Sequence, residues 1–88
     1  MAAATVTSGY PLRESVGSLT LFIWKLSACA DTNTLATGLG VNLIGAWANS
    51  EGDETAGEEG VNVVNSSGTL TFGLKTTSVV WVYALARV

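Results

Sequence analysis

Two apolar faces alternate along residues 18–30, SLTLFIWKLSACA, and no other feature constrains the fold as strongly. One face carries Leu19, Leu21 and Ile23, and the other carries Phe22, Trp24 and Leu26. Alternation with a period of two predicts a β-strand, and apolar residues on both faces indicate a strand in the middle of a sheet or beneath a neighbouring subunit. Residues 78–88, SVVWVYALARV, are also apolar on both faces, so we expect a second strand of this kind.

Turn signals divide the rest of the chain into further short strands. We expect strands over residues 2–8, 41–48, 61–65 and 69–75, with the last two joined as a hairpin around the SSG loop. Gly45 marks a bulge or a close approach of the backbone within its strand. Threonine, valine and glycine are plentiful and no segment predicts a helix. The pattern therefore predicts an all-β fold of about six strands, a small antiparallel β-sandwich or β-barrel with no significant helix.

We expect residues 1–88 to form one β domain, and two interpretations remain open for the start of the chain. In the first, residues 2–8 are an internal strand and residues 12–15 add an edge strand. In the second, residues 1–15 form an extended N-terminal arm. The residue before Pro11 is restricted to extended geometry in either case.

The size of the chain favours self-association. A domain of 88 residues buries a limited share of its surface, and small folds are usually reinforced by disulfides, metals or oligomerisation. Cys29 is the only cysteine and there is no histidine, which excludes an internal disulfide and a zinc site of Cys and His ligands. We therefore expect a homo-oligomer. The aromatic and apolar side chains that we consider as interface candidates, without separating core from surface tryptophans, are Tyr10, Leu12, Trp24, Trp47, Trp81 and Tyr83.

Composition argues against most biochemical activities. Histidine is the usual general acid or base near neutral pH, and its absence rules out Ser-His-Asp and Cys-His arrangements. The run GLGVNLIG has Leu43 where a dinucleotide fingerprint needs its third glycine, so no cofactor is expected. We interpret Cys29 as a small, buried hydrophobic residue. We therefore predict that the protein is not an enzyme. Ser-Lys and paired-carboxylate mechanisms, through Lys25, Lys75 or the acidic residues 50–60, stay formally open.

Charge and hydropathy narrow the partners further. The net charge is −3, and the four basic residues are spread along the chain, so we expect no direct binding to nucleic acid. The uncharged run at residues 32–50 contains too many polar residues for a membrane helix. The N-terminus lacks the pattern of a secretory signal. No membrane association is expected.

An acidic stretch, SEGDETAGEEG at residues 50–60, holds five of the seven acidic residues. Their spacing does not match a calcium-binding loop, in which oxygen ligands alternate around a glycine. We interpret the stretch as a solvent-exposed loop and assign it no metal, although a weak cation site and a contact with a basic partner remain alternatives. The carboxylates are Glu51, Asp53, Glu54, Glu58 and Glu59.

The layout of the chain resembles small all-β head-decoration or cement proteins of tailed bacteriophage virions. The resemblance rests on the Thr/Val-rich start ATVTSGYPLRES, the early strand GSLTLFIWKLSA, the TGLGV step, the DETAG loop and the closing SSGTLTFGLKTTSVVWVYALA hairpin. It implies a virion protein, assembled in the host cytoplasm, that forms a trimer or another symmetric oligomer and reinforces a shell of major capsid protein. Residues 2–15 match the arm with which such proteins reach the capsid.

A second hypothesis comes from a different class of protein. A small β-sandwich can also be a ligand-binding module, in which an exposed tryptophan stacks on the ring of a carbohydrate. The sequence alone does not choose between the two.

Overall fold

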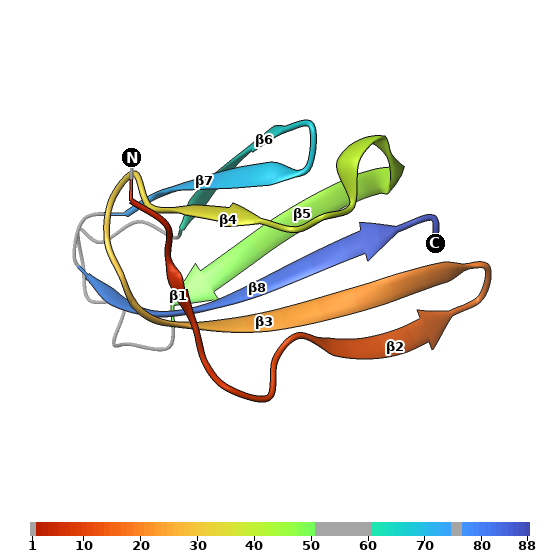
Figure 1. Cartoon of the computed structure of the whole chain (residues 1–88), viewed down its shortest axis with the longest axis horizontal. Helices are drawn as coiled ribbons and strands as arrows, with labels where there is room; N and C mark the ends of the chain where they lie inside the picture. The colour runs from red at the N-terminus through yellow and green to blue at the C-terminus, as the bar shows by residue number, and fades with distance from the viewer. Residues whose placement is uncertain (1, 51–60, 75–76) are drawn as a thin grey trace.

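A computed structural model describes residues 2–50, 61–74 and 77–88 of the chain. Two antiparallel sheets pack against each other as a small sandwich (Figure 1), which confirms the predicted all-β class. The larger sheet consists of β1 (Thr5–Val6), β2 (Leu12–Val16), β3 (Leu19–Cys29), β5 (Leu43–Ser50) and β8 (Ser78–Ala86). The smaller sheet consists of β4 (Thr34–Ala36), β6 (Asn62–Ser66) and β7 (Thr69–Gly73), and the 3₁₀ turn η1 spans Gly40–Asn42.

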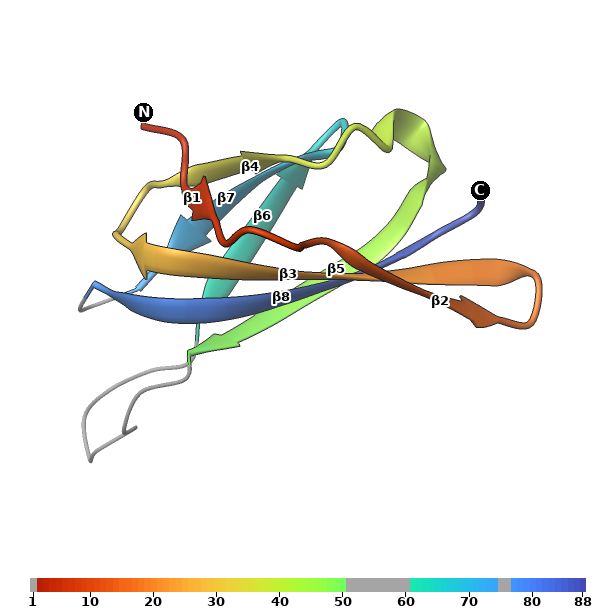
Figure 2. The ribbon, with the colours of Figure 1, turned by 60° about the horizontal axis from the view of Figure 1, so that its bottom comes forward.

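The two long strands with two apolar faces are central in the larger sheet, as predicted. β3 lies between β8 and an edge formed by β1 and β2, and β8 lies between β3 and β5. In the smaller sheet β7 lies between β4 and β6. Figure 2 shows the two sheets as separate layers. Buried side chains from both sheets form one core.

The core is built from one face of each long strand. The predicted alternation is correct on β3, where Phe22, Trp24 and Leu26 point inward. Opposite them on β8 stand small residues, with Ala84 beside Phe22 and Val82 beside Trp24, so that large rings and short side chains fill the layer together. The other buried side chains are Cys29, Leu35, Leu43, Leu70, Phe72, Val80 and Ala86.

The start of the chain lies along the sheet. β1 pairs with residues 26–27 of β3, and β2 pairs with residues 19–23 of the same strand. Ala3 also forms a parallel bridge with Thr34 of β4, so this segment contacts both sheets. Residues 5–6 and 12–16 are therefore edge strands of the larger sheet, which favours the interpretation of this segment as strands. That it serves as an arm towards a partner stays a prediction.

The hairpin of β6 and β7 is confirmed, and its tight turn packs against a neighbouring loop. Ser67 and Gly68 both have positive φ, 50° and 92°, as a two-residue hairpin turn requires. The N–H of Gly68 donates to Asn65 Oδ1 at 2.9 Å, and the Gly68 carbonyl accepts bonds from the N–H and the hydroxyl of Thr37 at 3.0 and 2.6 Å. The turn is thereby fixed to the segment that leads from β4 to η1.

The sequence pattern predicted the bulge at Gly45 but did not predict the short strand β4. Gly45 coincides with a register shift between Leu43 and Gly45 in the β5–β8 ladder, which confirms the predicted bulge. β4 was not predicted, because three residues are too few for alternation to be visible. Its pairing with β7 comes from the tertiary structure.

Substituting Gly68 by alanine tests the packing of this turn. A Cβ at Gly68 would lie 2.6 Å from the Gly40 backbone nitrogen, whereas at Gly9, which has the same φ of 92°, no atom lies within 4 Å. Both substitutions strain a left-handed backbone, at a cost of about 1–2 kcal/mol, and only Gly68→Ala adds a clash, which costs about 1–3 kcal/mol more. Urea unfolding of the two variants measures the difference. Equal losses of stability would contradict the described contact.

Candidate functional site

The candidate site is the outer face of the larger sheet, meaning the face turned away from the smaller sheet. The strand register places one residue from each of four strands side by side across this face. In order across the sheet, the row consists of Leu12, Ile23, Tyr83 and Trp47. We call it the central row.

Two further rows border the central row, one on each side. On one side, Glu14, Leu21, Leu85 and Gly45 are in register. On the other side, Lys25, Trp81 and Asn49 are in register. Across these three rows the face carries one carboxylate, one ammonium group and otherwise mainly apolar or aromatic groups.

The aromatic side chains of the outer face contact one another. Trp47 and Tyr83 stack with their centroids 5.7 Å apart and their planes at 19°. Tyr10 meets Trp81 edge to face at 5.7 Å, and the Lys25 Nζ lies 5.2 Å from the Trp81 centroid. Trp47 keeps 49% of its surface exposed. Aromatic groups in such arrangements bury large apolar areas with little loss of conformational freedom when a partner covers them.

The structure separates the six interface candidates into two groups. Leu12, Trp47 and Tyr83 belong to the central row, and Tyr10 packs on Trp81 in the next row. Trp24 is different, because it is 4% exposed and stacks on Phe22 inside the sandwich. The structure therefore corrects the candidacy of Trp24, which is a core residue. Side chains alternate between the two faces of β3, so Trp24 and Ile23 lie on opposite faces of the sheet. This alternation was visible in the sequence.

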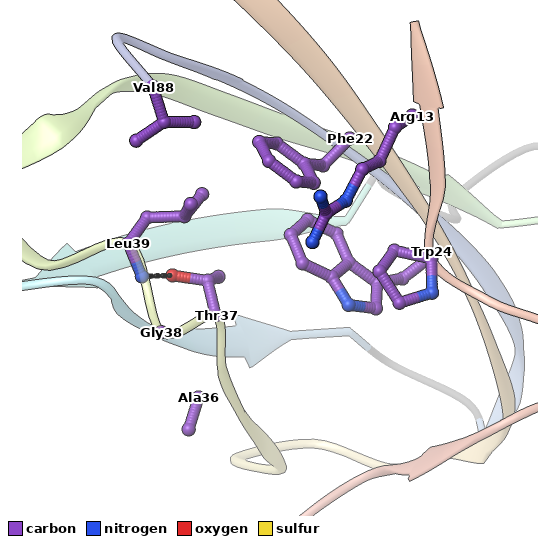
Figure 3. A pocket seen from close by; sticks show the side chains of 9 residues that line it. Arg13, Phe22, Trp24, Ala36, Thr37, Gly38, Leu39 and Val88 are labelled. Carbon is purple, nitrogen blue, oxygen red and sulfur yellow. Dashed lines mark hydrogen bonds between the residues drawn. The ribbon is translucent and has the colours of Figure 1, made fainter.

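A groove opens at one edge of the sandwich, between β2 and β3 on one side and the segment after β4 on the other (Figure 3). Its volume is about 500 Å³. Figure 3 shows Arg13, Phe22 and Trp24 gathered on one side and Thr37, Gly38 and Leu39 facing them. Nothing in the sequence predicted this groove, because its walls are far apart in the chain.

The groove has few polar side chains. The Arg13 guanidinium carbon lies 5.3 Å from the centroid of Phe22. The Thr37 hydroxyl donates to the Gly68 carbonyl at 2.6 Å and accepts from the Leu39 N–H at 3.2 Å. The hydroxyl proton is thus already engaged, and among the side chains that line the groove only the Arg13 guanidinium is charged.

The acidic stretch, metal binding and membrane spans were also considered in the sequence. Residues 51–60, which hold the five carboxylates of the acidic stretch, lie outside the described residues. Among the residues that the structure does describe, no group of three or more potential metal ligands comes together. Within the same described ranges, no helix has the length and apolar character of a membrane span.

Comparison with known proteins adds no relative. No protein-family model matches the chain, and neither the curated proteins nor the solved structures gave a significant match. The function therefore has to be argued from the site itself.

Cys29 is fully buried, as predicted, and burial raises the pKa of its thiol above the ordinary value of 9.0. The thiolate is the reactive form, so a thiol reagent at about pH 8 should modify the folded protein on the order of a hundredfold more slowly than the protein unfolded in urea. The stability contributed by the neutral thiol should also decrease as the pH rises through the unfolded pKa, because the unfolded thiol ionises first. Equal modification rates in the two states would contradict the burial of Cys29.

Proposed function

We propose that this protein is a non-enzymatic structural protein that assembles with other protein subunits through the outer face of its larger sheet. The setting that we propose for it is a virion, where it decorates or cements a capsid, as its resemblance to phage decoration proteins implies. The observation that carries the proposal is the central row with its aromatic neighbours. An antiparallel sheet with one solvated face normally carries polar residues on that face.

The composition of the outer face supports a protein partner. Contiguous exposed apolar surface on a small protein marks an interaction site, and interface centres are enriched in Trp and Tyr and poor in charge. Lys25 and Glu14 are the charged side chains of the three rows, and both lie towards the β2–β3 edge. The rest of the face can be covered without removing a charge from water.

The placement of these two charges favours a second copy of the chain as one partner. Glu14 belongs to the row on one side of the central row, and Lys25 belongs to the row on the other side. Consider two copies whose outer faces pack together, related by a two-fold axis that runs along the central row. This rotation places each flanking row of one copy over the other flanking row of the second copy. Glu14 of one copy then approaches Lys25 of the other, twice in the dimer.

The same rotation matches the shapes of the rows. The row of Trp81, with Tyr10 packed on it, comes to face the row of Leu21, Leu85 and Gly45, so large rings meet shorter side chains and a glycine. Such a self-complementary contact is isologous and closes as a dimer. This arrangement favours an even number of subunits over the trimer that the resemblance implies.

Charge reversal tests the two-fold contact. Glu14→Lys or Lys25→Glu alone should weaken self-association roughly tenfold, because each creates two like-charge contacts in the dimer. The double variant should recover most of the loss. Sedimentation equilibrium or light scattering over a range of concentrations measures the effect.

Arg13→Glu is the matched control, because it changes net charge as Lys25→Glu does while its side chain faces the groove. It should leave self-association unchanged. A monomer at all accessible concentrations would contradict self-association, and a stable trimer would contradict the two-fold arrangement while leaving an oligomeric role intact.

A second candidate function rests on the stacked pair of Trp47 and Tyr83. A half-exposed indole beside a phenol can stack on a sugar ring, as in carbohydrate-binding modules. Titration with a panel of oligosaccharides, followed by tryptophan fluorescence, distinguishes this function. Saturable quenching that Trp47→Ala abolishes would favour the sugar-binding module, and no response would leave the assembly function as the proposal.

A further inference from the structure

The groove at the edge of the sandwich has the features of a small-molecule site, independently of the outer face. Its volume of about 500 Å³ is within the range of small-ligand pockets, roughly 300–1,000 Å³. Two elements of the larger sheet and the segment after β4 line it, so the sandwich fixes its shape. Pro11, Phe22, Trp24, Ala36, Leu39 and Val88 contribute apolar side chains to its walls.

Arg13 gives the groove a positively charged side chain. None of the side chains that line the groove is acidic, and Arg13 makes no ion pair with any residue in the described part of the chain. The guanidinium lies over the Phe22 ring at 5.3 Å, which holds it at the wall. Glu14, its neighbour in sequence, projects to the opposite face of β2.

Trp24 supplies a second donor. The residue is 4% exposed, and its indole N–H makes no hydrogen bond with the residues that the structure describes. Within those residues no buried side-chain nitrogen or oxygen lacks a partner, so the N–H must still be reached by solvent. Because Trp24 lines the groove, we infer that solvent reaches the N–H from that side. An indole N–H can only donate, and it needs an acceptor when a ligand displaces that solvent.

The available side-chain groups define the ligand by elimination. Arg13 and Trp24 offer donors, while the Thr37 hydroxyl has used its proton on Gly68. A sugar or an amine needs acceptors, which these side chains supply poorly. A carboxylate has two oxygens in one plane, which suits a guanidinium fork and one further N–H. We propose that the groove binds a small organic carboxylate, with its charged group at Arg13 and Trp24 and its apolar body against the walls.

NMR spectroscopy tests this site directly through the Trp24 indole. In ¹⁵N-labelled protein the three tryptophans give three indole N–H signals. Phenylacetate is the probe, and phenylacetamide, which has the same ring without the charge, is its control. Phenylacetate should shift the assigned Trp24 signal saturably, and the amide should bind at least about tenfold more weakly.

Two charge-removing variants make the test specific. Arg13→Gln should weaken phenylacetate binding at least about tenfold, because it removes the charge in the groove. Lys25→Gln, which removes the same charge from the outer face, should leave it unchanged. Dispersed amide spectra confirm that both variants fold.

Three results would overturn the proposal. They are no saturable Trp24 shift at millimolar phenylacetate, equal binding of the amide, or equal weakening by the two variants. A shift confined to Trp47 or Trp81 would also reject the groove and place the contact on the outer face.

Discussion

The pairing of β3 with β8 supports every other part of the structure. These two strands supply most of the buried side chains, and their inner faces are complementary in size, with Phe22 and Trp24 on β3 next to Ala84 and Val82 on β8. Each then offers its other edge to further strands, β8 to β5 and β3 to β1 and β2. The central row of the outer face exists only because these ladders hold four strands in register. The proposed assembly site and the core thus depend on the same hydrogen bonds.

Alternation along β8 connects core packing with the aromatic outer face. Val80 and Val82 point into the core, so Trp81 and Tyr83 must point outward. A shift of one residue in the register would bring both rings inside and move the valines to the surface. The core has no room for that exchange, because Phe22 and Trp24 on the neighbouring strand β3 already fill the space beside these valines. The pattern that fills the core therefore also fixes which residues of β8 lie on the outer face. Packing of the core does not require that these residues be aromatic.

The fold could be predicted to the extent that its signals are local. The two-faced strands, the hairpin with the SSG loop and the bulge at Gly45 follow from alternation and glycine placement. β4 could not be predicted, because its three residues form a strand only through pairing with β7. The outer face was foreseen as a set of apolar candidates, but its rows depend on register between strands distant in sequence. The groove depends on packing between β2 and the segment after β4, which no local pattern encodes.

The edge strand β2 shows why a face is a more suitable contact than an edge for self-association. In its two-residue hairpin with β3, Val16 pairs with Leu19, so the N–H and C=O groups of Arg13 and Ser15 point away from the sheet. Two copies could pair antiparallel through their β2 edges. If both Arg13 and Ser15 form hydrogen bonds in this pairing, Arg13 of one copy lies opposite Ser15 of the other. Glu14 then lies opposite Glu14 of the other copy, on the two-fold axis. Like charges directly opposite destabilise such a pair, and charged edge strands resist added strands in general. The proposed face-to-face packing would instead bring the same Glu14 towards Lys25 of the second copy. One carboxylate thus disfavours assembly through the edge and favours assembly through the outer face.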